Sequence, residues 1–71
     1  MAYFHKNKNI LHIGESENKY YTYDINTGIL IGLKGTPISR IPHIFNVLEK
    51  YDDIPMYYKN MIRSNWQFDE L

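Results

Sequence analysis

The sequence predicts an α+β domain, in which an N-terminal three-stranded antiparallel β-meander packs against two C-terminal α-helices. Residues 9–34 hold short runs of β-branched and aromatic residues, which alternate with polar residues and are separated by turn sequences. Residues 40–64 instead carry apolar residues at helical spacing. Strands and helices therefore occupy separate blocks of the chain, which is typical of the α+β class rather than of alternating α/β folds.

The length of the chain, 71 residues, allows one small domain over residues 1–71, either as a whole protein or as the N-terminal module of a longer one. A domain of this size buries only roughly 60% of the surface that its unfolded chain exposes, which leaves little room for a deep substrate pocket. The sequence contains no cysteine, so disulfides and thiolate metal sites are excluded.

The first two strands are predicted at residues 9–14, "NILHIG", and 19–25, "KYYTYDI", on either side of a polar turn. The second run is rich in residues that favour a pleated surface. Its alternation places three side chains on the core face: Tyr21, Tyr23 and Ile25. Tyr20 therefore faces the other way. In the first strand the apolar residues occupy both faces, so its core-facing side stays open.

The third strand is predicted at residues 29–34, "ILIGLK", after the turn "NTG" at residues 26–28. Gly28 suits the left-handed position of a type I turn with a G1 bulge. With this turn, the core-facing side chains of the third strand are Ile29, Ile31 and Leu33. The outward-facing ones, on the same side as Tyr20, are Leu30 and Lys34.

The stretch "YDINTGILIG", residues 23–32, resembles the Tyr/Asp-x-x-Thr-Gly hairpin found in many β-propeller blades. The match covers ten residues and reflects shared turn chemistry. A propeller requires several blades, and this chain has one such hairpin. The resemblance therefore implies a hairpin here and no particular function.

The first helix is predicted at residues 40–51, with Ser39 as its candidate N-cap and Pro42 in its first turn. Its apolar stripe consists of Ile41, Ile44, Phe45, Leu48 and Tyr51. The connection to the next helix is short, which favours a compact helical hairpin.

The second helix is predicted at residues 53–64, with Asp52 or Asp53 as its cap and Pro55 in its first turn. Its apolar stripe consists of Ile54, Tyr57, Tyr58, Met61 and Ile62. The tail "NWQFDEL", residues 65–71, returns as a fourth strand or lies as a flap over the core.

Catalytic and metal-binding patterns are missing from the sequence. His5, His12 and His43 lack the helical i, i+3 or i+4 spacing of paired metal ligands. No serine has the glycine context of a nucleophile elbow, and no glycine-rich stretch matches a phosphate loop or a dinucleotide-binding turn. We therefore expect no catalytic residue, no metal, no cofactor and no enzymatic activity.

The charge balance also excludes some functions. Eight basic and eight acidic residues give a net charge of zero, whereas a dedicated binder of phosphate backbones needs a clear basic excess. No apolar run reaches the ~20 residues of a membrane-spanning helix, and the N-terminus lacks the apolar core of a signal peptide. We expect a cytoplasmic protein that does not act at membranes.

Tyrosine, with seven copies, provides the functional lead. Tyr20 is predicted on the outer face, and one of the adjacent Tyr57 and Tyr58 must lie at least partly outside the helix interface. The candidate binding residues are Lys19, Tyr20, Leu30, Lys34 and Tyr58. Such a surface suits a protein-contact hot spot or a stacking platform for single-stranded nucleic acid, unless the rings simply fill a shallow core.

We therefore expect a non-catalytic protein-binding module, with nucleic-acid binding through the tyrosines and lysines of the hairpin as the alternative. The partner is another protein or a second copy of the chain, because a small sheet leaves edges to cover. The Ile/Asn/Tyr/Lys-rich composition resembles that of small proteins from phages and plasmids of low-GC bacteria, which favours an inhibitor or accessory protein.

Overall fold

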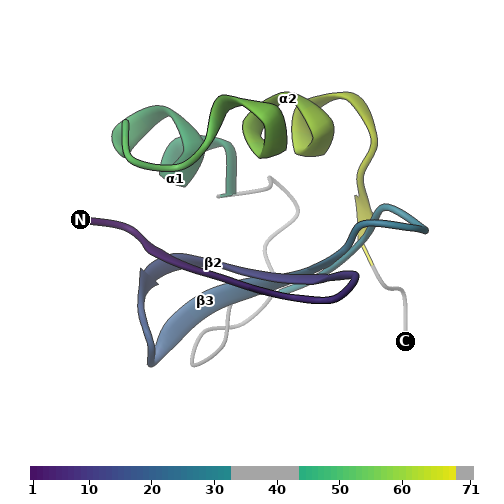
Figure 1. Ribbon diagram of the computed structural model, residues 1–71, viewed down its shortest axis with the longest axis horizontal. Coiled ribbons are helices and arrows are strands. Elements are labelled where there is room, and N and C mark those ends of the chain that lie inside the picture. The colour runs from purple at the N-terminus through teal and green to yellow at the C-terminus, as the bar shows by residue number, and fades with distance from the viewer. Residues whose placement is uncertain (33–43, 69–71) are drawn as a thin grey trace.

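The fold has two layers, a β-sheet and a pair of helices that cover one of its faces (Figure 1). The computed structural model describes residues 1–32 and 44–68. In chain order the elements are β1 (Tyr3–Asn7), β2 (Ile10–Ser16), β3 (Lys19–Asp24), β4 (Ile29–Ile31), α1 (Ile44–Lys50), α2 (Met56–Ser64) and β5 (Gln67–Phe68). The strands lie in the order β1-β2-β3-β4-β5, antiparallel from β1 to β4, with β5 parallel to β4. The predicted α+β class is thus confirmed, with four antiparallel strands instead of three.

The additional antiparallel strand is β1, which the sequence did not predict because it runs into a polar stretch of lysine and asparagine. β1 pairs with β2 from Tyr3 opposite Gly14 to Asn7 opposite Ile10. Lys8, in the two-residue turn between these strands, has a φ of 56°. Left-handed residues of this kind close two-residue hairpins. β1 is therefore a strand because it pairs with β2 across this turn, and not because of the strand propensity of its polar residues.

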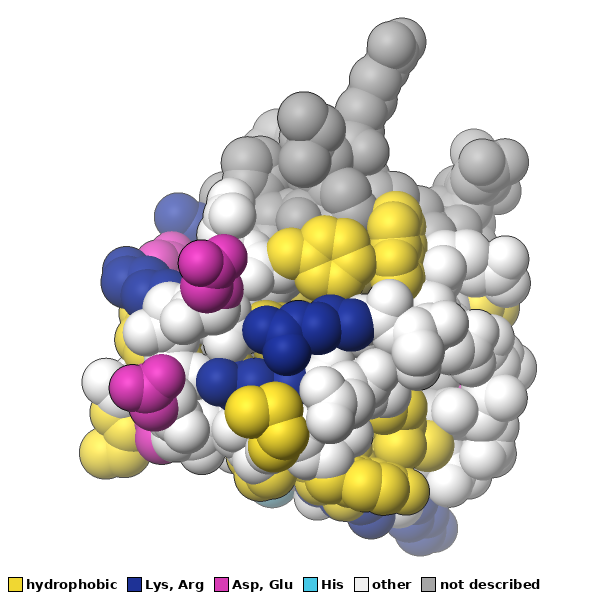
Figure 2. Space-filling view, turned by 90° about the horizontal axis from the view of Figure 1, so that it is seen from above, with side chains coloured by type: hydrophobic (Ala, Val, Ile, Leu, Met, Phe, Trp, Pro, Cys, Tyr) yellow, Lys and Arg dark blue, Asp and Glu magenta, His cyan; other side chains and the backbone are white. Residues whose placement is uncertain are grey.

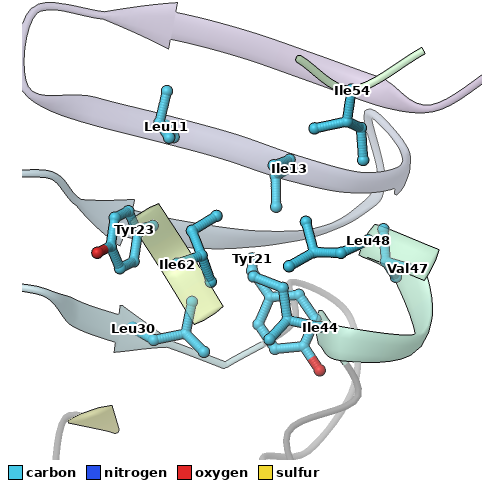
Figure 3. Packing of buried hydrophobic residues seen from close by; sticks show 10 residues of the cluster. All are labelled: Leu11, Ile13, Tyr21, Tyr23, Leu30, Ile44, Val47, Leu48, Ile54 and Ile62. Carbon is cyan, nitrogen blue, oxygen red and sulfur yellow. The ribbon is translucent and has the colours of Figure 1, made fainter. Parts of the chain in front are cut away.

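The core lies between the sheet and the helices (Figure 3). Its buried side chains are Leu11, Ile13, Tyr21, Tyr23, Leu30, Ile44, Val47, Leu48, Ile54 and Ile62. Leu11 and Ile13 define the inner face of β2, which the sequence left open. The inward assignment of Tyr21 and Tyr23 is confirmed, and Ile25 packs against the same cluster.

The facing predicted for β4 was wrong. Leu30, predicted outward, is fully buried in the core, and Ile31, predicted inward, is 47% exposed. Tyr23 lies opposite Leu30 rather than opposite Ile31. A shift of one residue in register moves every side chain of a strand to the other face, which explains the reversal.

The turn between β3 and β4 sets this register. The N–H of Gly28 donates to the C=O of Asp24 at 2.8 Å. Oδ1 of Asp24 accepts hydrogen bonds from the N–H groups of Asn26 (2.9 Å) and Thr27 (3.2 Å). Gly28 has a φ of 76°, the left-handed conformation predicted for it. The loop between the strands comprises residues 25–28, whereas the predicted turn comprised residues 26–28. Because Ile25 belongs to the loop, the pairing of β3 with β4 shifts by one residue.

Both predicted helices are present, with shifted bounds. α1 extends over Ile44–Lys50 in the described part of the chain. The predicted residues 40–43, the cap Ser39, and Leu33 and Lys34 of the third strand lie outside the described residues.

α2 begins at Met56 instead of residue 53, because Asp53 makes a different contact. The Asp53 carboxylate accepts the N–H of Ala2, with distances of 3.0 and 3.3 Å to its two oxygens. Pro55 directly precedes the helix, where no side chain caps the free N–H groups. The C=O of Pro55 accepts the first helical hydrogen bonds, from Tyr58 and Lys59 at 3.1 Å each. Asp53 therefore does not cap α2 as predicted, and instead it accepts a hydrogen bond from the residue that precedes β1.

α2 crosses the strands of the sheet from one side to the other. Near its start the ring of Tyr58 lies 5.5 Å from that of Phe4 on β1. Just past its end, the hydroxyl of Tyr23 on β3 donates to the C=O of Asn65 at 2.5 Å. The start of α2 therefore lies over β1, at the margin of the sheet.

The chain after α2 returns to the sheet as β5, the first of the two alternatives predicted for the tail. Gln67 lies opposite Ile29, and its N–H donates to the C=O of Gly28 at 2.9 Å. This short parallel strand pairs with β4 and forms one margin of the sheet, whereas β1 forms the other margin.

Candidate interaction surface

Four ring side chains form a continuous row on the outer face of the sheet, opposite the helices. The ring centroids of Tyr3 and Tyr20 lie 5.2 Å apart, and those of Tyr20 and His12 lie 4.6 Å apart. His12 in turn stacks with His5 at 6.2 Å. We refer to Tyr3, Tyr20, His12 and His5 as the aromatic row. It crosses three strands and reaches the margin of the sheet at β1.

The pairing of β1, β2 and β3 brings these rings together. His5 lies directly opposite His12, so their side chains share one face of the sheet. Tyr3 and Tyr20 both lie opposite Gly14, one on each neighbouring strand. Because Gly14 has no side chain, the two tyrosine rings meet across it.

Gly14 also permits a close approach of the backbone of β3. A Cβ atom at this position would lie 2.5 Å from the Cα of Tyr20 and 2.4 Å from the C=O oxygen of Lys19. Pairing becomes irregular here, since the register between β2 and β3 shifts between Gly14 and Ser16. The glycine is thus part of the geometry that positions Tyr20.

The aromatic row is accessible to a partner. His5 is exposed, and the side chains of Tyr3, His12 and Tyr20 are half-buried. Ile31 lies on the same face, opposite Thr22, and extends the accessible surface towards β4. The outer face therefore presents rings and an aliphatic side chain on rigid strands.

The structure separates the residues that the sequence grouped as one candidate site. Tyr20 lies on the outer face, as predicted, but Leu30 is in the core and cannot contact a partner. Tyr58 lies on the helix side, half-buried against Phe4. Lys34 lies outside the described residues. Of the predicted neighbours of Tyr20, Ile31 takes the place assigned to Leu30.

Lys19 forms part of an ion-pair network. Its Nζ lies 3.4 Å from a carboxylate oxygen of Glu15, and Nζ of Lys50 lies 3.5 Å from the other oxygen. These lysines, Lys19 first, hold the pKa of the Glu15 carboxyl below its ordinary value of 4.5. Because Lys19 is already paired with Glu15, it is a weaker candidate for a phosphate contact.

The start of α2 provides a second accessible apolar region. Tyr57 is 69% exposed and Met56 is 60% exposed, whereas Tyr58 is half-buried. The prediction that one of the adjacent tyrosines lies outside is therefore confirmed for Tyr57. This region lies on the helix side of the sheet and the aromatic row on the outer face, and β1 contributes residues to the contacts of both.

Sequence reasoning missed three of the four residues of the aromatic row. Tyr3 and His5 belong to β1, which was not predicted, and the face of His12 was left open with that of its strand. One signal could have found them. Tyr3 and His5 alternate with other residues before the polar pair at residues 8–9, and a two-residue hairpin turn at that pair places His5 opposite His12.

Residues 1–32 and 44–68 contain neither a cluster of metal-ligand side chains nor a helix of membrane-spanning length. No three side chains of the kinds that bind metal ions lie together there, and the stacked pair His5–His12 has no third ligand among them. Neither α1 nor α2 is long and apolar enough to cross a membrane.

Comparisons with known proteins return no match: no family model, no curated protein and no solved structure is similar to this chain.

Proposed function

We propose that this chain is a non-catalytic protein-binding module that contacts its partner through the outer face of the sheet. The observation that supports this most is the aromatic row, four adjoining rings on the face of the sheet opposite the helices. An inhibitor or accessory protein of a phage or plasmid is the form of this function that the composition favours.

The chemistry of the aromatic row suits a protein partner. Tyrosine rings supply a large contact area and lose little conformational entropy on binding, and their hydroxyl groups accept or donate hydrogen bonds at the rim. Here the rings of Tyr3 and Tyr20 are already held against each other. A partner therefore meets a preorganised surface.

The charges favour a protein over a nucleic acid. The chain has no net charge, and Lys19, beside Tyr20, is paired with Glu15. The face formed by the helices, which lies opposite the aromatic row, carries basic side chains beside hydrophobic ones, with acidic side chains to one side (Figure 2). A binder of nucleic acid usually has a continuous basic surface instead. The adjoining rings nevertheless suit base stacking, so the test includes this alternative.

The test is the affinity of variants for a partner identified by cross-linking and mass spectrometry. Tyr20→Ala and Tyr3→Ala should each weaken binding at least about tenfold in calorimetric titration, as expected for rings at a hot spot. Tyr20→Phe keeps the ring and should keep most of the affinity. Asn46→Ala, an exposed position on α1, is the remote control.

Two results would count against the proposal, and a third would identify the partner. Unchanged affinity in both alanine variants would exclude the aromatic row as the contact. Binding of single-stranded DNA at ~50 mM salt, weakened by added salt and by Lys19→Gln, would favour the nucleic-acid alternative. Self-association detected by sedimentation and abolished by Tyr20→Ala would identify a second copy as the partner.

A further inference from the structure

β1 forms one margin of the sheet. It pairs with β2 alone in the sheet that the structure describes, so its other side carries main-chain N–H and C=O groups with no strand beside them there. The strand is five residues long and contains no proline or glycine. It is therefore able to accept a further strand by main-chain hydrogen bonds.

Contacts at three points hold β1 in place. At its start the N–H of Ala2 donates to Asp53. In its middle Phe4 packs on Tyr58 of α2. At its end the turn after Asn7 connects it to β2. An incoming strand thus does not have to order β1 first, which lowers the entropic cost of binding.

The start of α2 covers the helix side of this margin. Tyr58 contacts Phe4 on β1, and Tyr57 packs edge-on against Tyr58 with centroids 5.0 Å apart. Tyr57 and Met56, which precede Tyr58 in the first turn of α2, are apolar and largely exposed. A strand added to β1 would place its helix-facing side chains against these residues.

Lys6 indicates the charge of that strand. It lies opposite Leu11, so its side chain is on the helix side of the sheet, two residues from Phe4. It is exposed, and it makes no ion pair within residues 1–32 and 44–68. An acidic side chain directly opposite Lys6 would therefore be favoured.

A second copy of the chain does not meet this requirement. β1 has the sequence Tyr-Phe-His-Lys-Asn and contains no acidic residue. Antiparallel pairing of two copies about His5 would place Lys6 of one copy opposite Phe4 of the other. An inward-pointing lysine is a known device that discourages self-pairing of sheet margins.

We propose that β1 binds an extended segment of another protein, with an apolar residue opposite Phe4 and an acidic residue opposite Lys6, two positions away. This rests on the proposed protein-binding function and names its mode, strand addition to the sheet. Main-chain hydrogen bonds hold the segment, and Phe4, Tyr57 and Lys6 select its side chains.

The experiment titrates the full chain with the capped peptide Thr-Val-Thr-Glu-Thr-Val-Thr, followed by NMR of the main-chain amides. Its symmetry places Glu opposite Lys6 and Val opposite Phe4 whichever way the peptide runs. The matched control peptide has Lys in place of Glu. We expect shifts and slowed hydrogen exchange in β1, and binding of the Glu peptide about three- to tenfold tighter than the Lys peptide.

Lys6→Glu should reverse the preference between the two peptides, and Tyr57→Ala should weaken both. Unperturbed β1 amides at millimolar peptide, or a preference that Lys6→Glu leaves unchanged, would overturn strand addition. If Tyr20→Ala weakens binding of the natural partner while β1 ignores the peptides, only strand addition fails. If the peptides bind as expected while Tyr20→Ala and Tyr3→Ala leave the partner's affinity unchanged, the role of the aromatic row fails instead.

Discussion

At position 28 two constraints meet on one residue. Gly28 has a φ of 76°, where a Cβ atom costs roughly 1–2 kcal/mol. It also lies under Asn65, whose side-chain atoms would be 2.8–3.0 Å from an added Cβ. The glycine therefore serves both the turn that sets the register of β4 and the packing of the chain just past α2.

Gly28→Ala should lower the free energy of unfolding by about 1–2 kcal/mol, mainly because it adds strain at φ and also because the exposed side chain of Asn65 must move aside. Urea denaturation followed by circular dichroism measures this. The matched control measures Gly28→Ala in the Asn65→Gly background, where the crowding is absent and the loss relative to Asn65→Gly alone should be smaller. A denaturation midpoint of Gly28→Ala equal to that of the unsubstituted chain would contradict both constraints.

Among the elements, the connection between α2 and the sheet depends on Tyr23. Its ring is fully buried, and its hydroxyl donates to the C=O of Asn65, where α2 ends. One side chain of β3 thus fills the core and also holds the end of a helix. Burial raises the pKa of this phenol above its ordinary value of 10.0, and the negative charge of Asp24 adds to the shift.

Tyr23→Phe should lower the free energy of unfolding by about 1–2 kcal/mol, because it leaves the carbonyl of Asn65 without its donor. Since the pKa is raised in the folded state, the neutral phenol stabilises the fold fully below about pH 10, the unfolded value. This contribution is lost as the pH rises through the folded pKa. The free energies of unfolding of the unsubstituted chain and of Tyr23→Phe should therefore become more similar in alkaline solution. Urea denaturation of both proteins from pH 8 upwards measures this. A constant difference across this range would show that ionisation of Tyr23 is not linked to unfolding.

The elements also show what sequence reasoning could and could not predict. β2, β3 and both helices were predicted because alternation and helical spacing are strong signals there. The facing of β4 was not, because Ile29, Leu30 and Ile31 are all apolar and only the length of the turn fixes their register. Tyr20 was predicted on the outer face from its own strand. Its neighbours were not, since the aromatic row requires β1, which forms through pairing.

For the whole molecule, the sheet separates the residues that maintain the fold from those proposed to bind. Tyr21 lies in the core between sheet and helices, and Tyr20, the preceding residue, lies in the aromatic row on the other side. A domain of this size has a stability of only about 3–5 kcal/mol, so the loss of one large core side chain is critical. The loss of a half-buried ring outside the core is not.

Tyr21→Ala should therefore cost about 3–5 kcal/mol and leave the chain largely unfolded at 25 °C, because it opens a large cavity beneath the helices. Tyr20→Ala should cost less than about 1.5 kcal/mol and keep a cooperative thermal transition. Circular dichroism melting curves of the two variants make the comparison, with Tyr20→Phe as the conservative control. Unfolding by Tyr20→Ala would show that the aromatic row maintains the fold, and a loss of binding in that variant would then carry no information about a partner. A folded Tyr20→Ala protein would instead show that the core does not depend on this ring. A loss of binding in that variant would then indicate that Tyr20 contacts the partner.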